Sequence, residues 1–343
     1  MLDNPLHKRL LLGALLVLAL LFPVVAANDY VIYVMALAYI MAIAAVGLNL
    51  ILGYTGQLNL AHAGFMAVGA YTVGILTVDY GVPYWVAFAL AGFVAAALGF
   101  LAGVVSLRLK THYFVIFTLC VGFIMYLVIE KWDWLTHGTV GLIGIPAPTP
   151  IPTPFGAIRF DTPVQQYYLV LAFLVLALWV MHRIVRSLLG RAFVAIRNSE
   201  DLAEALGIDL MRTKVLAFVL STFYAGLAGA LYAGFVRFLG PAMALESQTF
   251  DMVTFILVGG IGTLFGPVLG AVALTWITQS LQFLQDYRMI VFGPLLILLV
   301  MYFPQGILGA VNERRAKRAA QAAQAKRAAQ SRQQSGRGAQ ANA

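Results

Sequence analysis

Charged residues are scarce in this sequence. Of its 343 residues, 10% are charged and 62% are hydrophobic, and the mean hydropathy is +0.88. A soluble domain carries about 25% charged residues and about half apolar ones, so a soluble globular protein is excluded. The apolar residues also form unbroken runs of about 20 residues, unlike the alternating strands of a membrane β-barrel. The sequence therefore predicts an all-α polytopic membrane protein.

Chemical motifs are lacking as well. The single cysteine, Cys120, excludes a disulfide framework and a cysteine metal cluster, and the five histidines are scattered. The chain has no phosphate-binding loop, no zinc-protease His-Glu-x-x-His motif and no Gly-x-Ser-x-Gly nucleophile motif. We therefore expect no enzymatic activity, no metal and no cofactor in this chain.

The net charge of +8 is concentrated at one end. Residues 312–343 hold eight of the 22 basic residues and one of the 14 acidic ones, so this tail carries +7 and the rest of the chain +1. A basic surface for nucleic acid is therefore not expected. The tail repeats Ala, Gln, Lys and Arg, and its alanine face is too weak to insert into lipid. We expect a disordered tail that rests at most on lipid headgroups.

The apolar runs suggest the membrane topology. Nine stretches meet or approach the roughly 20 residues that a membrane-spanning helix needs: 10–26, 30–52, 62–78, 84–106, 112–130, 166–186, 215–236, 252–284 and 288–303. With a cytoplasmic N-terminus, 18 Lys and Arg residues lie on the cytoplasmic side and four outside. The positive-inside rule then places both termini in the cytoplasm.

Nine crossings would leave the tail outside, and stretch 252–284 resolves this conflict. Glycines and a proline interrupt it, which a continuous lipid-facing helix would not tolerate. We expect a broken element that enters from outside and returns there, with its backbone facing protein or water. The fold prediction is thus about 8 to 10 transmembrane helices with broken, re-entrant glycine-rich elements.

The expected organisation is simple. Residues 1–311 form the transmembrane domain, and residues 312–343 form the tail. Residues 131–165 form an external loop with six prolines, and residues 187–214 form a charged, helix-prone inner loop. In the inner loop, Ser199 is placed to cap a short helix that Gly207 ends.

Two uncharged, glycine-rich stretches interrupt the apolar pattern, one in each half of the chain. Transporters build sites near the membrane midplane from such interruptions, often in inverted repeats. The placement of one stretch in each half is compatible with an inverted repeat. Close helix packing is the alternative reason for the glycines, and His62 alone fits a buried histidine with its hydrogen bonds satisfied. The candidate pathway residues are Gly53, Gln57, Asn59, His62, Gly259, Gly262 and Thr263.

The inner loop fits a docking helix for another protein, since it is short and charged and has a small apolar patch. An amphipathic helix on the membrane surface is the alternative. The candidate coupling residues are Arg191, Arg197, Glu204, Ala205 and Gly207.

Several of these motifs occur together in one known family. Residues 53–65 and 69–71 resemble the signature of LivM-type permeases of ABC importers for branched-chain amino acids, and residues 204–207 resemble the family's short coupling motif. The remaining similar segments, in the same order as in that family, are 107–110, 113–114, 136–142, 259–271 and 304–306.

This resemblance implies a subunit in a bacterial inner membrane that transports nothing alone. It would pair with a second, LivH-like permease subunit, two cytoplasmic ATPase subunits and an external solute-binding protein. ATP would bind to the ATPases, in agreement with the missing phosphate-binding loop. The absence of a carboxylate deep within a span also counts against a proton- or sodium-driven transporter.

Three alternatives remain open. Related permeases of the same fold import urea or short amides. A stand-alone channel or facilitator would have no use for a docking helix, and a membrane enzyme would need a nucleophile and a base. The motifs do not identify the substrate, because in such importers selectivity lies mostly in the binding protein.

Overall fold

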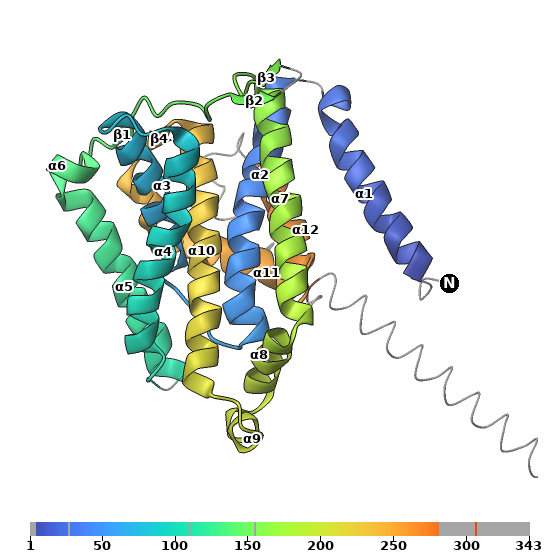
Figure 1. The fold of residues 1–343 in the computed structure, drawn as a ribbon, viewed down its shortest axis with the longest axis vertical. Coiled ribbons are helices and arrows are strands. Elements are labelled where there is room, and N and C mark those ends of the chain that lie inside the picture. The colour runs from blue at the N-terminus through green and yellow to red at the C-terminus, as the bar shows by residue number, and fades with distance from the viewer. Residues whose placement is uncertain (1–4, 27, 110, 154–155, 281–305, 307–343) are drawn as a thin grey trace, which may run out of the picture.

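The computed structural model describes residues 5–26, 28–109, 111–153, 156–280 and 306, and it is a bundle of helices (Figure 1). The helices are α1 (Pro5–Val25), α2 (Asp29–Asn49), α3 (His62–Val78), α4 (Tyr84–Ser106), α5 (Thr111–Lys131), α6 (Asp133–Thr136), α7 (Pro163–Arg186), α8 (Leu188–Asn198), α9 (Glu200–Ala205), α10 (Leu210–Val236), α11 (Glu246–Gly259) and α12 (Gly266–Ser280). A π-helix, η1 (Leu50–Tyr54), extends α2, and a 3-10 helix, η2 (Pro241–Ala244), precedes α11.

Five of the described helical segments are long and apolar enough to cross a membrane: 29–54, 84–106, 112–131, 163–186 and 210–236. Two shorter apolar helical segments cover residues 13–25 and 62–78. The polytopic helical class is therefore confirmed, while the count of about 8 to 10 crossings and the inverted repeat stay predictions. The expected span at 288–303 and the tail at 312–343 lie outside the described residues.

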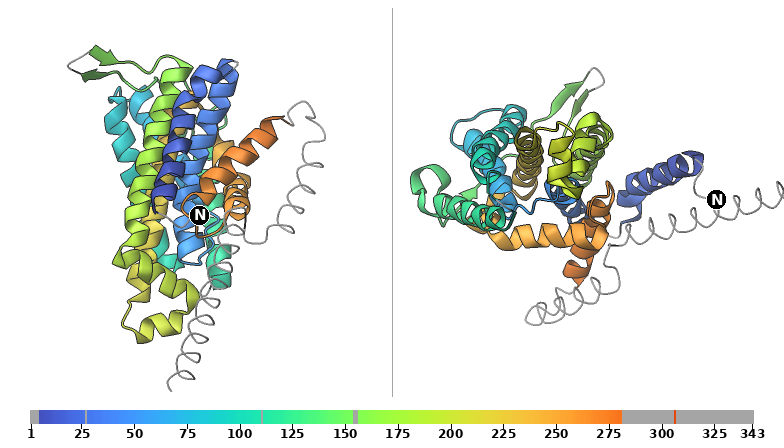
Figure 2. Two further views of the ribbon diagram at one scale, coloured as in Figure 1. Left: turned by 90° about the vertical axis from the view of Figure 1, so that its right-hand side faces the viewer. Right: turned by 90° about the horizontal axis from the view of Figure 1, so that it is seen from below.

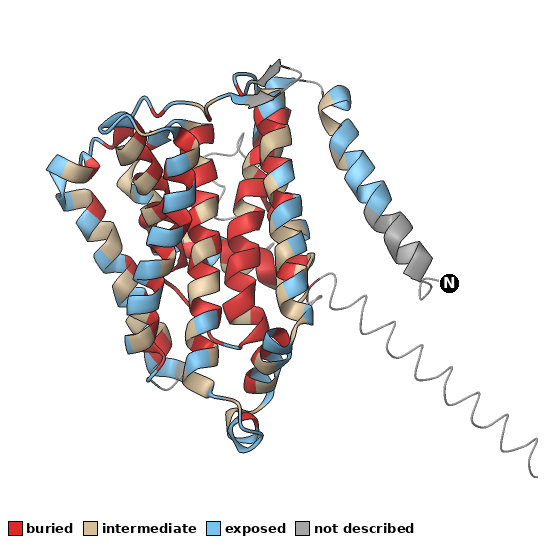
Figure 3. Cartoon of the chain, viewed as in Figure 1, coloured by how far each residue is buried: buried red, intermediate tan, exposed pale blue. Residues whose placement is uncertain are grey.

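The core of the bundle is formed by α2, α3 and α10. Buried residues run along α2 and α10, whereas exposed residues mark the outer helices (Figure 3). On α4 and α5, large apolar side chains are exposed, including Phe93 at 65%, Leu101 at 62% and Phe123 at 51%. Apolar surface of this extent is costly in water, so this face suits lipid.

Glycines bring α3 and α10 into close contact. A Cβ on Gly69 would lie 2.3 Å from the carbonyl oxygen of Gly226, and one on Gly229 would lie 1.9 Å from that of Met66. Small residues at such crossings let two backbones approach, which drives helix packing in membranes. For these glycines, packing is therefore the observed role.

The two ends of the bundle differ. At one end, the α9 end, lie α8 and α9; at the other, the β end, lie four short strands (Figure 1). Strands β1 (Leu142–Ile143) and β4 (Phe238–Leu239) pair antiparallel, as do β2 (Ile151–Thr153) and β3 (Gly156–Ile158). These strands depart from the all-α prediction. Strands β1, β2 and β3 lie in loop 131–165, whose prolines disfavour helix, and β1 pairs with β4, which follows α10.

The predicted interruption of stretch 252–284 is present. Helix α11 ends at Gly259, residues 260–265 form a turn, and α12 begins at Gly266. Helix α11 lies across the bundle, as the view from the α9 end shows (Figure 2, right). Helix α12 runs back along α2, and the Tyr30 hydroxyl near the start of α2 donates to Gln279 Oε1 at 3.0 Å. The pair therefore forms a helical hairpin against α2.

Candidate functional site

The first glycine-rich stretch is a break between two helices. Helix α2 continues through η1, residues 55–61 are non-helical, and α3 begins at His62. We call residues 53–61, from the end of η1 to the start of α3, the first break. Thr55 Oγ1 donates to the Leu50 carbonyl at 3.1 Å, and the Gln57 N–H donates to the Ile51 carbonyl at 2.9 Å. The chain therefore leaves α2 in a tight, hydrogen-bonded turn.

Most of the first break is buried, with Gly56 exposed, so its backbone groups need protein partners. The Leu60 N–H donates to Thr118 Oγ1 of α5 at 3.2 Å. Just beyond the break, the Ala63 N–H donates to Thr249 Oγ1 of α11 at 2.9 Å. Two neighbouring helices thus hold this non-helical backbone in place.

Asn59 and His62 are fully buried beside these contacts. Asn59 Oδ1 accepts from the Ala61 N–H at 3.0 Å, and His62 Nε2 lies 3.0 Å from the Ala44 carbonyl of α2. Asn59 Nδ2 and His62 Nδ1, in contrast, are buried without a hydrogen-bond partner among the described residues. Unpaired buried polar atoms are costly. Asn59 and His62 therefore each keep one buried nitrogen available for a further hydrogen bond.

The second glycine-rich stretch, residues 260–265, is a shorter turn that we call the second break. Gly260 and Gly262 have φ values of 126° and 68°, which favour glycine. Thr263 Oγ1 donates to the Gly260 carbonyl at 2.8 Å and accepts from the Gly266 N–H at 3.1 Å. Thr263 therefore closes the turn and supports the start of α12.

One side chain of α2 joins the two breaks. Asn49 Nδ2 donates to the Thr263 carbonyl at 2.8 Å, and Asn49 Oδ1 accepts from the Gly262 N–H at 3.0 Å. A Cβ on Gly53 would lie 2.1 Å from Asn49 Oδ1 and 2.6 Å from the Gly262 nitrogen. The structure thus brings Gly53, Gly262 and Thr263 together.

Sequence reasoning missed Asn49. The available signal was a lone amide within an apolar run, because polar residues in spans tend to serve a specific role. Two further glycines tighten the second break: a Cβ on Gly259 would lie 1.8 Å from the Gly266 carbonyl oxygen, and one on Gly306 would lie 2.5 Å from the Gly260 backbone.

At the α9 end, the inner loop forms the two helices α8 and α9. Ser199 caps α9, since its Oγ accepts from the Leu202 N–H at 3.3 Å. Gly207 has a φ of 84° just after the helix, and its N–H donates to the Glu204 carbonyl at 2.8 Å. The predicted short helix, with its cap and its glycine stop, is confirmed.

Arg197 of α8 touches both breaks. Its guanidinium donates to the Gly53 carbonyl at the end of α2. Its Cγ lies 3.2 Å from the Cβ position of Gly56, and its Nη1 lies 2.7 Å from that of Gly262. A cation suits this place, because the last carbonyls of a helix are unpaired and partly negative.

A second connection runs through Glu200 of α9. Gln57 Nε2 donates to Glu200 Oε1 at 3.3 Å, and Lys214 Nζ of α10 lies 2.6 Å from Glu200 Oε2. The Lys214 side chain is only 10% exposed. Gln57 therefore faces α9 and lies apart from the contacts made by Asn59 and His62. Nothing local in the sequence indicates this pairing.

The other predicted coupling residues lie on the surface of the α9 end. Arg191, Glu204, Ala205 and Gly207 are exposed. Leu202 and Leu206 are 61% and 72% exposed. This exposed set, the α9 surface, combines charged and apolar groups as protein-docking surfaces do. Among the residues that the structure describes, no three His, Cys, Asp or Glu side chains gather as a metal site would need.

The structure has helices long enough to cross a membrane, two interrupted helical elements inside the bundle, and an exposed helix pair joined to both. Together these features define a membrane permease. The chain belongs to the family of branched-chain amino acid transport system permease components, whose family model matches residues 30–300.

Named relatives agree with this family. The LivM permease protein of the high-affinity branched-chain amino acid transport system of Salmonella typhimurium is 33% identical over 320 residues, which covers 88% of this chain and 75% of that protein. The Escherichia coli LivM protein is 33% identical over 319 residues, with the same coverage. The Escherichia coli LivH permease protein is 27% identical over 293 residues, covering 78% of this chain and 91% of LivH. No solved structure matches the chain.

Proposed function

We propose that this chain is the transmembrane permease subunit of an ABC importer for leucine, isoleucine and valine. The similarity to LivM supports the substrate class. The observation that carries the role of a coupled subunit is Arg197, which ties the exposed helix pair α8–α9 to both breaks. A stand-alone channel would not need that connection.

The proposed assembly contains a second, LivH-like permease subunit, two ATPase subunits and an external solute-binding protein. The similarity to both LivM and LivH supports two related permease subunits. The α9 surface is the proposed ATPase contact, with Leu202 and Leu206 as its apolar part and Arg191 and Glu204 as its charged part. The chain itself needs no cofactor, since ATP binds to the partner subunits.

The proposed orientation places the α9 end and both termini in the cytoplasm and the β end outside the inner membrane. The six basic residues between Arg183 and Lys214 support this side, because cytoplasmic loops are rich in Lys and Arg. Residues 1–311 act as the permease domain, and the basic tail 312–343 has no assigned role in transport.

In the proposed mechanism, ATP binding on the partners moves α8 and α9, and Arg197 and Glu200 pass this movement to the breaks. Gly53, Gly262 and Thr263 lie where the two breaks meet, with Gly259 at the end of α11, whereas Asn59 and His62 offer their unpaired nitrogens to the passing solute. The breaks thus open and close a path that the ATPases control.

Uptake by the reconstituted complex tests this function. The chain is assembled in proteoliposomes with the LivH-like subunit, the two ATPases and the binding protein, and uptake of labelled leucine, isoleucine and valine is compared with uptake of urea. We expect ATP-dependent uptake of the three amino acids and none without the ATPases. Urea uptake would instead support the urea-importer alternative, and uptake without ATPases would support a facilitator.

A further inference from the structure

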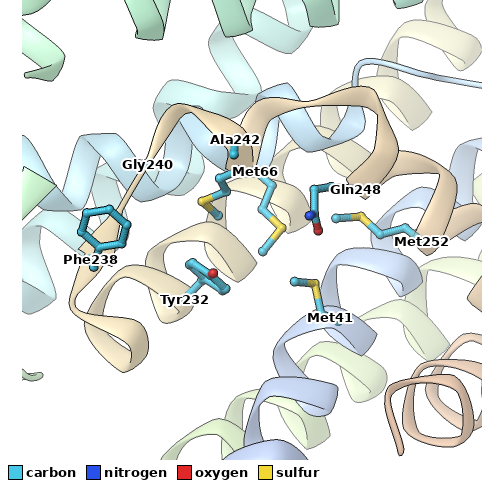
Figure 4. Close-up of a pocket in the computed structure, with 9 residues that line it drawn as sticks. Met41, Met66, Tyr232, Phe238, Gly240, Ala242, Gln248 and Met252 are labelled. Carbon is cyan, nitrogen blue, oxygen red and sulfur yellow. The ribbon is translucent and has the colours of Figure 1, made fainter. Parts of the chain in front are cut away.

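A cavity of about 200 Å³ lies between α2, α3, α10, η2 and α11 (Figure 4). Four of its lining residues are methionines: Met41, Met66, Met243 and Met252. We call it the methionine cavity. The side chains of Met41, Met66 and Met252 gather around one space with that of Gln248 (Figure 4). None of the candidate pathway residues lines this cavity.

The methionine cavity lies between the β end and the first break. Phe238 of strand β4, at the β end, forms part of its wall. Met66 follows His62 by one helical turn, and Met252 follows Thr249 by one turn. The hydrogen bond from the Ala63 N–H to Thr249 Oγ1 joins these two helices, so Met66 and Met252 each lie about one helical turn from the contact that follows the first break. A solute leaving the cavity toward the α9 end would next meet Asn59 and His62.

The lining disfavours a charged side chain. Among the described residues, no charged side chain lines the cavity, so an ionic side chain would lose its hydration there without a partner. Methionine is flexible and polarizable, and surfaces rich in methionine adapt to apolar groups of different shape. The volume of the cavity is below the roughly 300–1,000 Å³ of sites for drug-sized ligands, which suits a single small solute.

Gln248 provides the polar contact. Its side-chain amide has no hydrogen-bond partner among the described residues, and the Tyr232 ring lines the opposite part of the wall. An amide can donate to the carboxylate or accept from the ammonium group of an amino acid, so the charged end of the solute would lie at this polar part of the wall and its side chain among the methionines.

We infer that the methionine cavity is a transit site that binds the aliphatic side chain of the transported amino acid, with Gln248 bound to its polar end. This inference rests on the proposed function and adds a substrate contact to it. The adaptable methionines explain how one site accepts leucine, isoleucine and valine. Lipid or detergent tails are the competing occupants, which the test must distinguish.

The first test uses uptake by the assembled importer. Met252→Phe adds bulk to the cavity, and Met35→Phe on α2, outside the cavity, is the matched control. We expect Met252→Phe to lower leucine uptake by about tenfold or more, since small changes in pocket shape alter selectivity on that scale. Valine, which is smaller, should lose less, and binding-protein-stimulated ATPase should persist. Equal loss for all three amino acids, or no loss in assembled complex, would overturn the inference.

The second test needs no transport. In a Cys120→Ser background, Met243→Cys places a single thiol in the cavity wall, and its rate of alkylation is measured in the complex. We expect leucine, isoleucine and valine to slow the labelling several-fold, with glycine and aspartate without effect. Unchanged labelling, or equal slowing by glycine, would exclude a site for aliphatic side chains.

The two tests separate this inference from the proposed function. If the wild-type complex imports none of the three amino acids, the proposed function fails, and thiol protection still decides whether the cavity binds them. If the wild type imports leucine but leucine leaves Met243→Cys labelling unchanged, only the methionine cavity is rejected.

Discussion

The two breaks interrupt the same helix bundle in different ways. The first break is long and buried, and hydroxyl side chains from α5 and α11 hold it in place. The second break is a short turn that depends on the positive φ values of Gly260 and Gly262 and on Thr263. Neighbouring helices fix the conformation of the first break, whereas the backbone of the second break determines its own conformation.

This difference suggests that the two breaks have different functions. A turn built on glycines can absorb a change in backbone angles, as hinge residues do. A segment that its neighbours hold can instead keep Asn59 and His62 in place along a path. Asn49 and Arg197 each contact both breaks, so they should make the two breaks move together.

The largest effect is expected for Asn49→Leu. This change leaves the Gly262 N–H and the Thr263 carbonyl without their partner. Two unpaired, partly buried groups cost about 2–4 kcal/mol together. The purified complex should lose thermal stability and uptake, as measured by a melting curve and by leucine transport. Asn198→Leu, at an exposed position, serves as the control. Equal stability of the two variants would show that Asn49 does not join the breaks.

Gly53→Ala should come next. The added Cβ would lie 2.1 Å from Asn49 Oδ1 and 2.6 Å from the Gly262 nitrogen, so Gly53 and the second break must separate. Overpacking of this kind costs about 1–3 kcal/mol. We expect lower thermal stability and reduced leucine uptake. Gly13→Ala is the matched control, because nothing lies within 4 Å of its Cβ position. A fully active Gly53→Ala complex would contradict the close contact between the breaks.

Gln57→Leu and Asn59→Leu compare the two parts of the first break. Gln57→Leu removes one hydrogen bond to Glu200, at a cost of about 1 kcal/mol. It should lower stimulated ATPase and uptake together, since the connection to α9 is lost. Asn59→Leu should lower uptake while stimulated ATPase continues, and the double variant should stop uptake in assembled complex. Retained uptake in the assembled double variant would reject the pathway role.

The smallest effect on stability is expected for Gly207→Val. No atom lies within 4 Å of a Cβ there, so the cost comes only from the φ of 84° and is about 1 kcal/mol. Gly207→Asn is the control, because Asn tolerates this conformation. The Val variant should assemble but lose stimulated ATPase, as should Glu204→Lys through the docking contact. Stimulated ATPase at the wild-type level in both Gly207→Val and Glu204→Lys would show that α9 is not the coupling element.

Local features of this chain could be predicted from its sequence. Interruptions at residues 53–64 and 259–266 follow from glycines within apolar runs. Helix α9 follows from the Ser199 cap and Gly207. These signals depend on neighbours in the sequence, and the structure confirms them.

Long-range contacts could not be predicted in this way. Arg197 and Gly53 are 144 residues apart, and Asn49 and Thr263 are 214 apart. Such contacts depend on the packing of helices that are far apart in the sequence, and no local sequence pattern indicates them. The contact between Gln57 and Glu200 is long-range in the same way, because Glu200 lies on another helix, 143 residues along the chain. The methionine cavity likewise collects residues from six separate elements.

The central claim is that Arg197 transmits the movement of α8 to both breaks. Three variants of the complete importer in lipid decide it: Arg197→Gln, Arg191→Gln on the exposed face of the same helix, and Arg212→Gln at the start of α10, whose guanidinium side chain is 90% exposed. Each is measured for ATPase association, binding-protein-stimulated ATPase and leucine uptake.

We predict that Arg197→Gln keeps the ATPases bound but loses both stimulation and uptake. Arg191→Gln should weaken ATPase association, and Arg212→Gln should behave as the wild type. Normal stimulation and uptake in an assembled Arg197→Gln complex would contradict the claim.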